Sequence, residues 1–285
     1  MLRTNGDQLV MISVIGEIAS PRASSDPLRV GYDGVARNLP GVGGITYNVK
    51  VGDSAMGWAG DHVEPGVTVK NSDALQNGAL QSLSCVGNRA IVVAGDAKGA
   101  EGFVTGTHGG IEHLICYFDA EALEQLVIGD KIQVRAHGQG IQLTDHPEIK
   151  AKNIDPGLLE KLNLKESNGG IEVPVAAIVP AQLMGSGLGA TSERGDYDIV
   201  TNDATVHEKY GLSRLRLGDL VAVKDHDNTI GRAYREGAVT VGVIVHTDSF
   251  AAGHGPGMTT VLTSATDRLR PVIAEGANIA EYLGV

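Results

Sequence analysis

Two histidines and an aspartate stand within nine residues near the C-terminal end of the chain. His246 and Asp248 follow an apolar run, Ala238 to Val245, and His254 stands in the turn Gly253-His254-Gly255-Pro256-Gly257. A turn so rich in glycine and proline is neither helix nor strand. Because loops at the end of a rigid strand often carry binding and catalytic groups, the sequence predicts a functional site here.

A further histidine, His108, has glycines close on both sides, in Gly106-Thr107-His108-Gly109-Gly110. Bare backbone around an imidazole lets a ligand approach closely. Neutral imidazole is the commonest nitrogen ligand of transition metals, and catalytic zinc keeps one position open beside three protein ligands. We therefore predict a divalent metal, zinc before others, held by His108, His246 and His254. Metal-free, hydrogen-bonded roles for these imidazoles remain the alternative, because the chain contains no H-E-x-x-H or C-x-x-C signature.

The turn from Gly60 to Gly66 carries three ionisable groups, Asp61, His62 and Glu64. Asp61 could orient His62 or share a metal with it, and Glu64 could act as a base. We predict Asp61, His62 and Asp248 as catalytic residues, with one of the two aspartates accepting a proton from metal-activated water. The alternative is that these acidic groups only solvate a loop.

Glycine-rich turns could also present backbone N–H groups to an anionic ligand or an oxyanion. We predict ligand binding by Gly185 and Gly187 in the loop Gly185 to Gly189, and by Gly255 and Gly257 in the later turn. Ser186 is a candidate nucleophile, although Gly-Ser-Gly does not match the G-x-S-x-G pattern. A flexible loop without chemistry is the alternative.

Other reactive side chains have simpler predicted roles. Asp196 and Asp198 would share one face of a strand, where they could bind a divalent cation through oxygen, although turn formation is typical of such acidic clusters. His113 alternates with isoleucines and is expected to be structural. Cys85 and Cys116 adjoin or lie within apolar runs and are expected to be buried and unreactive.

The elements that position these groups are predicted to be mainly strands, with a few short helices. Glycine is abundant, with 39 residues, and it separates many short apolar runs. Helices are expected near 119–126, 153–164 and 279–283, the first two capped by Asp119 and Asp155. We predict two β-barrel-like halves as domains 1–166 and 167–285, and a cyclophilin-like form is one option for the second.

One internal similarity relates the two halves. The pattern of leucines, Gly-Asp and apolar residues over 123–134 recurs over 212–223 at a constant offset of 89, which also aligns His137 with His226. Gene duplication is one explanation. A turn shared by many small β-barrels, with no common ancestry, is the other.

Composition excludes several classes of protein. The net charge of −11 argues against a nucleic-acid binder, because phosphate contacts need clustered lysine and arginine. Two cysteines make no disulfide framework, and no apolar run approaches the ~20 residues of a membrane span. Without a clear leader, we expect a cytoplasmic protein with a small-molecule substrate and no membrane partner. A homo-oligomer is expected because edge strands are often buried against a second copy.

Several motifs taken together resemble an uncharacterised bacterial and archaeal family that carries only the label of a domain of unknown function. They are Gly60-Asp61-His62, Cys85-Val86-Gly87-Asn88, Thr107-His108-Gly109-Gly110, Met184-Gly185-Ser186-Gly187-Leu188-Gly189, Gly195-Asp196-Tyr197-Asp198 and Gly253-His254-Gly255-Pro256-Gly257. The resemblance spans nearly the whole chain and implies a two-part, strand-rich, soluble protein with no assigned activity. In general style the chain is also similar to the acetamidase/formamidase group, whose β-rich members hydrolyse small amides with histidine- and aspartate-bound metal. No full motif of that group matches, so no residue role is transferred.

The leading hypothesis is a metal-dependent hydrolase of a small C–N substrate, such as an amide, a lactam or a cyclic imide. Its site would lie between the two halves, where ligands are often bound. A non-catalytic binder of a small anionic metabolite is the second hypothesis. A metal-free lyase or isomerase that uses His62 or His254 as its base is the third.

Overall fold

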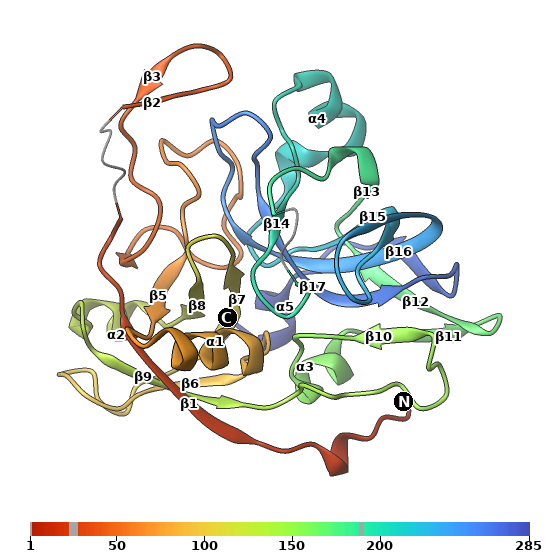
Figure 1. Ribbon diagram of the computed structural model, residues 1–285, viewed down its shortest axis with the longest axis horizontal. Helices are drawn as coiled ribbons and strands as arrows, with labels where there is room; N and C mark the ends of the chain where they lie inside the picture. Colours follow the sequence, from red (N-terminus) through yellow and green to blue (C-terminus); the bar gives the residue numbers. More distant parts are fainter. Residues whose placement is uncertain (1, 23–27, 188–190) are drawn as a thin grey trace.

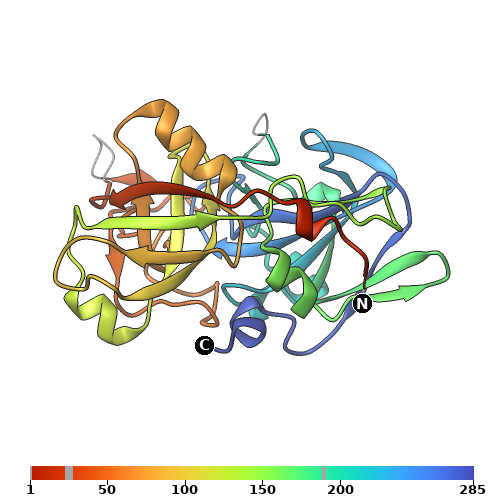
Figure 2. The ribbon, with the colours of Figure 1, turned by 90° about the horizontal axis from the view of Figure 1, so that it is seen from below.

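The computed structural model describes residues 2–22, 28–187 and 191–285, and it is built mainly from strands (Figure 1). The predicted mainly β class, with barrel-like halves and a few short helices, is confirmed. Figure 2 shows two strand-rich lobes side by side, the first formed by the N-terminal half of the chain. The candidate functional side chains lie on elements from both lobes. The packing of one lobe on the other therefore determines which of these side chains come together.

The first lobe is a closed six-stranded barrel. Its strands are β1 (Ile12–Ile18), β5 (Gly66–Lys70), β6 (Arg89–Val92), β7 (Glu101–His108), β8 (His113–Tyr117) and β9 (Lys131–Ala136). They pair in the order β1-β9-β6-β7-β8-β5, and β5 pairs again with β1 to close the ring. Buried apolar side chains such as Val69, Leu114 and Ile132 fill the barrel. Two short strands, β2 (Arg29–Val30) and β3 (Ala36–Arg37), form a hairpin outside it, and β4 (Ile45–Thr46) pairs with β5.

The second lobe contains a six-stranded and a three-stranded sheet. The larger sheet has the order β10-β17-β16-β15-β13, with β14 paired to β17. The smaller sheet has the order β11-β12-β18. The strands are β10 (Ile149–Ala151), β11 (Lys165–Ser167), β12 (Gly170–Val175), β13 (Ala177–Pro180), β14 (Tyr197–Asp198), β15 (Leu220–Asp227), β16 (Ala233–His246), β17 (Gly257–Ser264) and β18 (Leu269–Ile273). Every residue of β17 is buried, and β16 is buried from Ala238 to His246, so this hairpin forms the rigid centre of the lobe.

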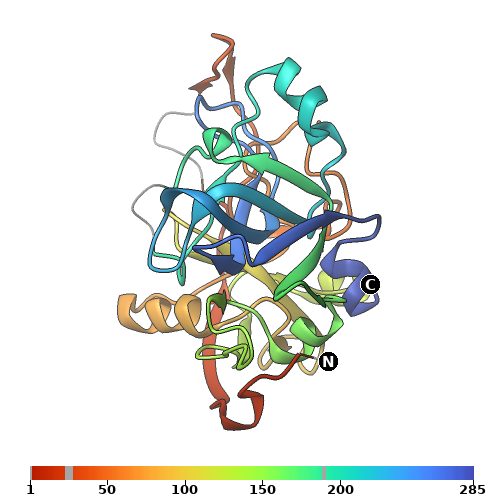
Figure 3. The ribbon, with the colours of Figure 1, turned by 90° about the vertical axis from the view of Figure 1, so that its right-hand side faces the viewer.

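Short helices cover the strands. They are α1 (Ala74–Leu83), α2 (Ala120–Gln125), α3 (Pro156–Lys161), α4 (Ala204–Tyr210) and α5 (Ile279–Leu283), with single 3-10 turns at Gly6–Gln8, Ala181–Leu183 and Leu212–Arg214. The predicted helices α2, α3 and α5 are confirmed, and Asp119 and Asp155 cap the first two as expected. Helix α1 lies at the outer surface of the barrel against β1 (Figure 3). No helix in the described part of the chain is long and apolar enough to cross a membrane.

The two lobes meet where β7 of the barrel crosses β16 and β17. The Thr107 backbone N–H donates to Thr259 Oγ1 over 3.2 Å, and the Thr107 hydroxyl donates to the Gly195 carbonyl over 3.1 Å. Gly106 allows this approach, because a Cβ there would overlap Val245. The contact brings the end of β7, which carries His108, against the end of β16, which carries His246.

The sequence pattern shared by 123–134 and 212–223 forms the same kind of turn in both lobes. Gly129 and Gly218 both have positive φ, 93° and 89°. In each turn the following aspartate accepts a hydrogen bond from the backbone N–H three residues earlier, Asp130 from Val127 over 3.0 Å and Asp219 from Arg216 over 2.7 Å. Only glycine takes such a φ without strain, which accounts for the repeated Gly-Asp. Duplication of the halves stays a prediction.

His226 on β15 is expected to make the protein less stable in acid. Burial, with a smaller effect of the Arg232 charge, lowers the pKa of His226 from 6.5 to about 4. The unfolded chain therefore binds this proton at a higher pH than the folded protein does. The stabilising contribution is complete above pH 6.5 and is lost as the pH falls towards 4.

Urea denaturation at pH 7 and pH 4 measures this effect. The loss of unfolding free energy should be about 3 kcal/mol greater for the parent protein than for a His226→Gln variant. Equal losses in the two proteins would contradict the prediction.

Candidate metal centre

Four histidines from distant parts of the chain converge at the junction of the lobes. His108 ends β7, His246 ends β16, His254 lies in the β16–β17 loop, and His62 lies in the loop before β5. The ring centroids of His108 and His246 are 4.2 Å apart, and those of His62 and His246 are 5.0 Å apart. Asp196 and Asp198, beside and within β14, complete two sets of potential metal ligands. We call His108, Asp196 and His246 the inner group, and His62, Asp198 and His254 the outer group.

The inner group is buried, and two of its atoms face each other without a hydrogen bond. The potential ligand atoms of its three residues lie within 4.8 Å of one another. His246 Nε2 and Asp196 Oδ2 are 2.7 Å apart, yet neither atom has a hydrogen-bond partner among the described residues. Buried polar atoms are rarely left unpaired, and a cation shared by these two atoms is one way to satisfy both.

Hydrogen bonds at Nδ1 orient the rings of three of these histidines. The Nδ1–H of His62 donates to Asp61 over 3.0 Å, that of His108 to Glu64 over 2.5 Å, and that of His246 to the Thr247 carbonyl over 2.9 Å. A neutral imidazole that donates from Nδ1 carries its lone pair on Nε2. Metal-ligating histidines are commonly oriented in this way by a carboxylate or a carbonyl.

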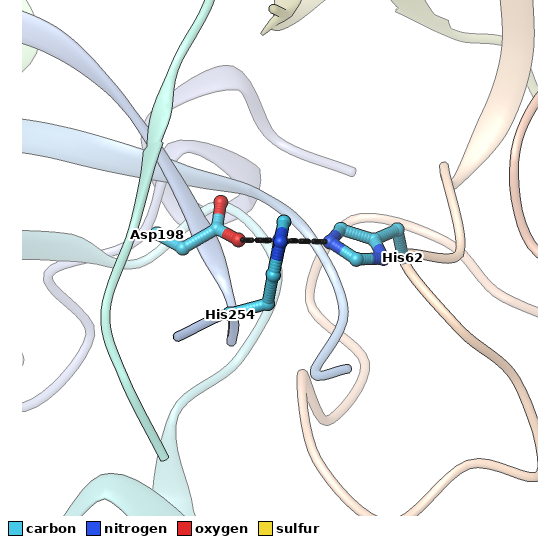
Figure 4. A group of neighbouring side chains, drawn as sticks. All are labelled: His62, Asp198 and His254. Atoms are coloured by element: carbon cyan, nitrogen blue, oxygen red, sulfur yellow. Dashed lines mark hydrogen bonds and ion pairs between the residues drawn. The ribbon is translucent and has the colours of Figure 1, made fainter. Parts of the chain in front are cut away.

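The outer group converges on one nitrogen atom. His254 Nδ1 lies 2.8 Å from Asp198 Oδ2 and 3.0 Å from His62 Nε2 (Figure 4). The His62 Nε2 and Asp198 Oδ2 atoms are themselves 3.6 Å apart. The His254 side chain is 30% exposed, whereas the His246 side chain is fully buried, so the outer group lies on the solvent side of the centre.

Glu64 supports the inner group from behind. Its carboxylate is fully buried and accepts hydrogen bonds from His108, from His113 over 3.1 Å, from the Gly43 N–H over 2.7 Å and from the Thr68 hydroxyl over 2.6 Å. Burial alone would raise the pKa of Glu64, but the bonds from the two histidines outweigh it and hold the pKa well below its usual range. Glu64 therefore positions His108 and His113, and its role as a base stays a prediction.

The carboxylates favour positive charge at the centre of the site. Burial opposes a charge on His246, but Asp196 and Asp198 raise the pKa of His246 well above its ordinary value. Burial and the neighbouring His246 lower the pKa of His108. Burial would raise the pKa of Asp198, but its hydrogen bonds to His246, His254 and His62 hold that pKa well below its usual range. The site thus stabilises a cation next to the two aspartates.

His62 is held in an uncommon backbone conformation. Its φ is 56°, in the left-handed region that non-glycine residues seldom adopt. The His62 N–H donates to the Asp248 carbonyl over 3.1 Å, and the Val63 N–H donates to Thr247 Oγ1 over 2.9 Å. These bonds tie the loop before β5 to the β16–β17 loop, and they aim His62 at His254.

A cavity of about 1080 Å³ lies beside Asp61, the hydrogen-bond partner of His62. Its lining includes Asp61, Trp58, Arg29 and the loop residues Phe250 to Ala252, which lead into His254. The hairpin of β2 and β3 borders it, since the Tyr32 N–H donates to the Phe250 carbonyl over 2.8 Å. The cavity is large enough for a small organic ligand.

Asp61 and Asp248, the two predicted bases, both accept hydrogen bonds from neighbouring protein groups. Asp61 accepts hydrogen bonds from His62, from the Ser249 hydroxyl over 2.6 Å and from Arg29 over 2.8 Å. Burial would raise the pKa of Asp61, but the bonds from His62 and Ser249 hold it below its usual range. The Asp248 carboxylate accepts from the Thr201 hydroxyl and from the Ser249 N–H, and it makes no hydrogen bond to these imidazoles among the described residues. Asp61 thus orients His62, while Asp248 braces the loop.

Two backbone N–H groups of the loop that begins at Gly185 donate hydrogen bonds within the protein. The Gly185 N–H donates to the Asp198 carbonyl over 2.8 Å, and the Ser186 N–H donates to the Gly253 carbonyl over 2.9 Å. These two amides are therefore engaged within the protein, while ligand binding by Gly185 and Gly187 stays a prediction. Leu188 and Gly189 lie outside the described residues. A Cβ on Gly187 would meet Asp196 and Tyr197, so this position is close-packed.

Glycine serves a different purpose in the later turn. A Cβ on Gly257 would overlap Asp196 Oδ2 and His246 Nε2, and one on Gly255 would overlap the Ile199 carbonyl. The bare backbone makes room for the ligand side chains themselves. Ser186 lies next to this region through a bond from the Asp198 N–H to its carbonyl, and no hydrogen bond of its hydroxyl is found among the described residues.

The cysteines lie away from this chemistry, as expected. Burial, with a smaller effect of Asp155, raises the pKa of the Cys85 thiol to about 12. Cys116 is buried within β8, and burial raises its thiol pKa as well. His113 is fully buried against Glu64, which agrees with the structural role predicted for it.

Comparison with known proteins identifies the family of this chain and a solved structure similar to it. A solved structure described as "Crystal structure of TM1086" is 52% identical, with a TM-score of 0.95 over 99% of each chain. No curated protein matches the chain, and a relationship to the acetamidase/formamidase group is not shown. Two family models match, the N-terminal domain at residues 28–160 and the C-terminal domain at residues 161–283. The chain belongs to the family described as "Domain of unknown function (DUF4438)".

Proposed function

We propose that this protein is a metal-dependent hydrolase that cleaves a C–N bond in a small substrate such as an amide, a lactam or a cyclic imide. The observation that carries the proposal is the pair of buried, unpartnered atoms His246 Nε2 and Asp196 Oδ2, 2.7 Å apart. With His108 they offer two imidazoles and one carboxylate, a donor set that hydrolytic zinc enzymes use. The predicted ligand set changes accordingly, because His254 belongs to the neighbouring outer group.

The surrounding residues have defined roles in this proposal. A zinc ion in the inner group would polarise the substrate carbonyl and lower the pKa of a water molecule. Asp198 pairs with His254 and lies beside the inner group, with its Oδ1 3.6 Å from His246 Nε2. Asp61 and Glu64 keep His62 and His108 in position. The cavity next to Asp61 receives the substrate, with Trp58 and Arg29 in its wall.

Hydrolysis is expected to depend on bound metal. Protein stripped with a chelator should lose at least about 100-fold in the release of ammonia or acid from a panel of small amides, lactams and cyclic imides. Added Zn²⁺ should restore the rate, and elemental analysis of the untreated protein should find zinc.

Two variants sharpen this experiment. His108→Ala should lose activity even with added Zn²⁺, whereas His146→Ala should keep it, because His146 is also part-buried and carboxylate-paired but bonds to Glu166 elsewhere. Undiminished hydrolysis in the presence of chelator would contradict the proposal. Bound metal without turnover of any panel member would also contradict it and would favour a non-catalytic binder.

A further inference from the structure

We propose that the outer group binds a second divalent cation, so that the centre holds two ions with Asp198 as the bridge between them. The inference rests on the proposed function, since it adds an ion beside the one assigned to the inner group. The donors of the outer group are the imidazoles of His62 and His254 and the carboxylate of Asp198.

The distances within the outer group fit a shared cation. A zinc-like ion about 2.1 Å from each of its tetrahedral ligands places those ligands about 3.4 Å apart. The three separations in the outer group are 2.8 Å, 3.0 Å and 3.6 Å. A small movement of the part-exposed His254 is enough to make the three separations equal. His62 and Asp198 are held in place by their own partners.

The hydrogen-bonding capacity of the outer group points the same way. His62 donates from Nδ1 to Asp61, so its Nε2 presents a lone pair, and Asp198 presents only acceptor oxygens. A single proton on His254 Nδ1 has to serve both acceptors at once. A divalent cation in place of that proton would bind three lone pairs together and balance the charge of the carboxylate.

Asp198 reaches both groups with different oxygens. Its Oδ1 lies 3.6 Å from His246 Nε2 of the inner group, while its Oδ2 contacts His254 and His62. A bridging carboxylate of this kind holds two ions about 3.5–4 Å apart in many hydrolytic enzymes. The 5.0 Å separation of the His62 and His246 rings leaves room for one ion at each.

The location of the outer group suggests what its ion would do. Asp61, the hydrogen-bond partner of His62, lines the cavity, as do the residues that precede His254. An ion here would lie on the cavity side of the centre, where a substrate oxygen arrives. Since His254 is the most exposed of the ligands, this ion should exchange faster and bind more weakly than the inner one.

Counting the metal ions bound per chain tests the inference without any activity assay. Metal-free protein is titrated with Mn²⁺ and separately with Zn²⁺, and the bound ions per chain are measured by elemental analysis after gel filtration. The parent and a His146→Ala control should each bind two ions. His254→Ala should bind one, with affinity for the second reduced at least 100-fold. The Mn²⁺-loaded parent should show an electron paramagnetic resonance spectrum of two coupled ions, and His254→Ala should show an uncoupled one.

The outcomes separate the two proposals. One ion per chain, kept in His254→Ala and lost in His108→Ala, would overturn the second site and leave the proposed hydrolase intact. One ion that is lost in His254→Ala but kept in His108→Ala would overturn the inner site. No bound ion in the parent protein would overturn both.

Discussion

Replacing Gly257 by alanine is expected to weaken metal binding by the inner group about 100-fold while leaving the protein folded. An added Cβ would overlap Asp196 Oδ2 and His246 Nε2, the two atoms that face each other without a hydrogen bond. One of these ligands must then move, and metal affinity is sensitive to such movement. The strand itself accepts alanine, since Gly257 does not have a positive φ.

Zinc titration of the metal-free variant measures the loss, and Gly231→Ala is the matched control. Gly231 also lacks a positive φ, and a Cβ there would meet no atom within 4 Å. This control should bind zinc as the parent does, and both variants should unfold cooperatively. If Gly257→Ala bound zinc with parental affinity, Asp196 and His246 would not be the ligands.

Gly257 also shows how a correct sequence signal can carry the wrong explanation. The glycines around His254 predicted backbone N–H groups presented to an anionic ligand, whereas the observed reason for glycine at 257 is that a Cβ there would overlap Asp196 and His246. The neighbours turn out to be protein side chains that pack against the bare backbone. Sequence alone locates the crowded position, but only the fold identifies what crowds it.

The starts of helices were predictable from the sequence where a single capping residue fixes the first turn. Asp119 and Asp155 marked helix starts because a carboxylate there accepts the unpaired N–H groups of the first turn. Helix α1 was not predicted, although Asp73 caps it in the same way. Its buried face includes Asn77 and Gln81, so it lacks the apolar periodicity that identifies a packed helix.

The convergence of the histidines was predicted in part, and for a physical reason. The end of an apolar strand located His246, and glycines located His108 and His254. Which residues share a ligand point depends on how the barrel docks on the second lobe. His62 and His254 are 192 residues apart in sequence, yet their nitrogens are 3.0 Å apart. No local pattern encodes that pairing.

Asp196 and Asp198 were also predictable from local sequence only in part. Strand alternation placed them on one face and suggested a cation, but not the imidazoles they meet. The structure sets Asp196 against His246 at 2.7 Å and Asp198 against His254 at 2.8 Å. The sequence does not predict the buried donors of Glu64, because Thr68, His108 and His113 come from different strands of the barrel wall.

Glu64→Gln is expected to be the most destabilising isosteric substitution at the centre. Four donors, two of them imidazoles, share the Glu64 carboxylate in a fully buried position. A glutamine offers one acceptor oxygen, and its amide N–H₂ would face another donor. Breaking a buried charged pair costs about 3–5 kcal/mol, and loss of a carboxylate behind a ligating histidine costs about 10–100-fold in metal affinity.

Urea unfolding of metal-free protein separates the stability effect from the metal effect, and zinc titration then measures the second. Glu17→Gln is the control, because Glu17 is an exposed carboxylate of the same barrel paired with Lys131 on a neighbouring strand. Its unfolding free energy should change by less than about 1 kcal/mol. Were Glu64→Gln as stable as Glu17→Gln, Glu64 would not be the charged anchor of His108 and His113. A stable variant with weakened zinc binding would instead confine its role to orienting the His108 imidazole.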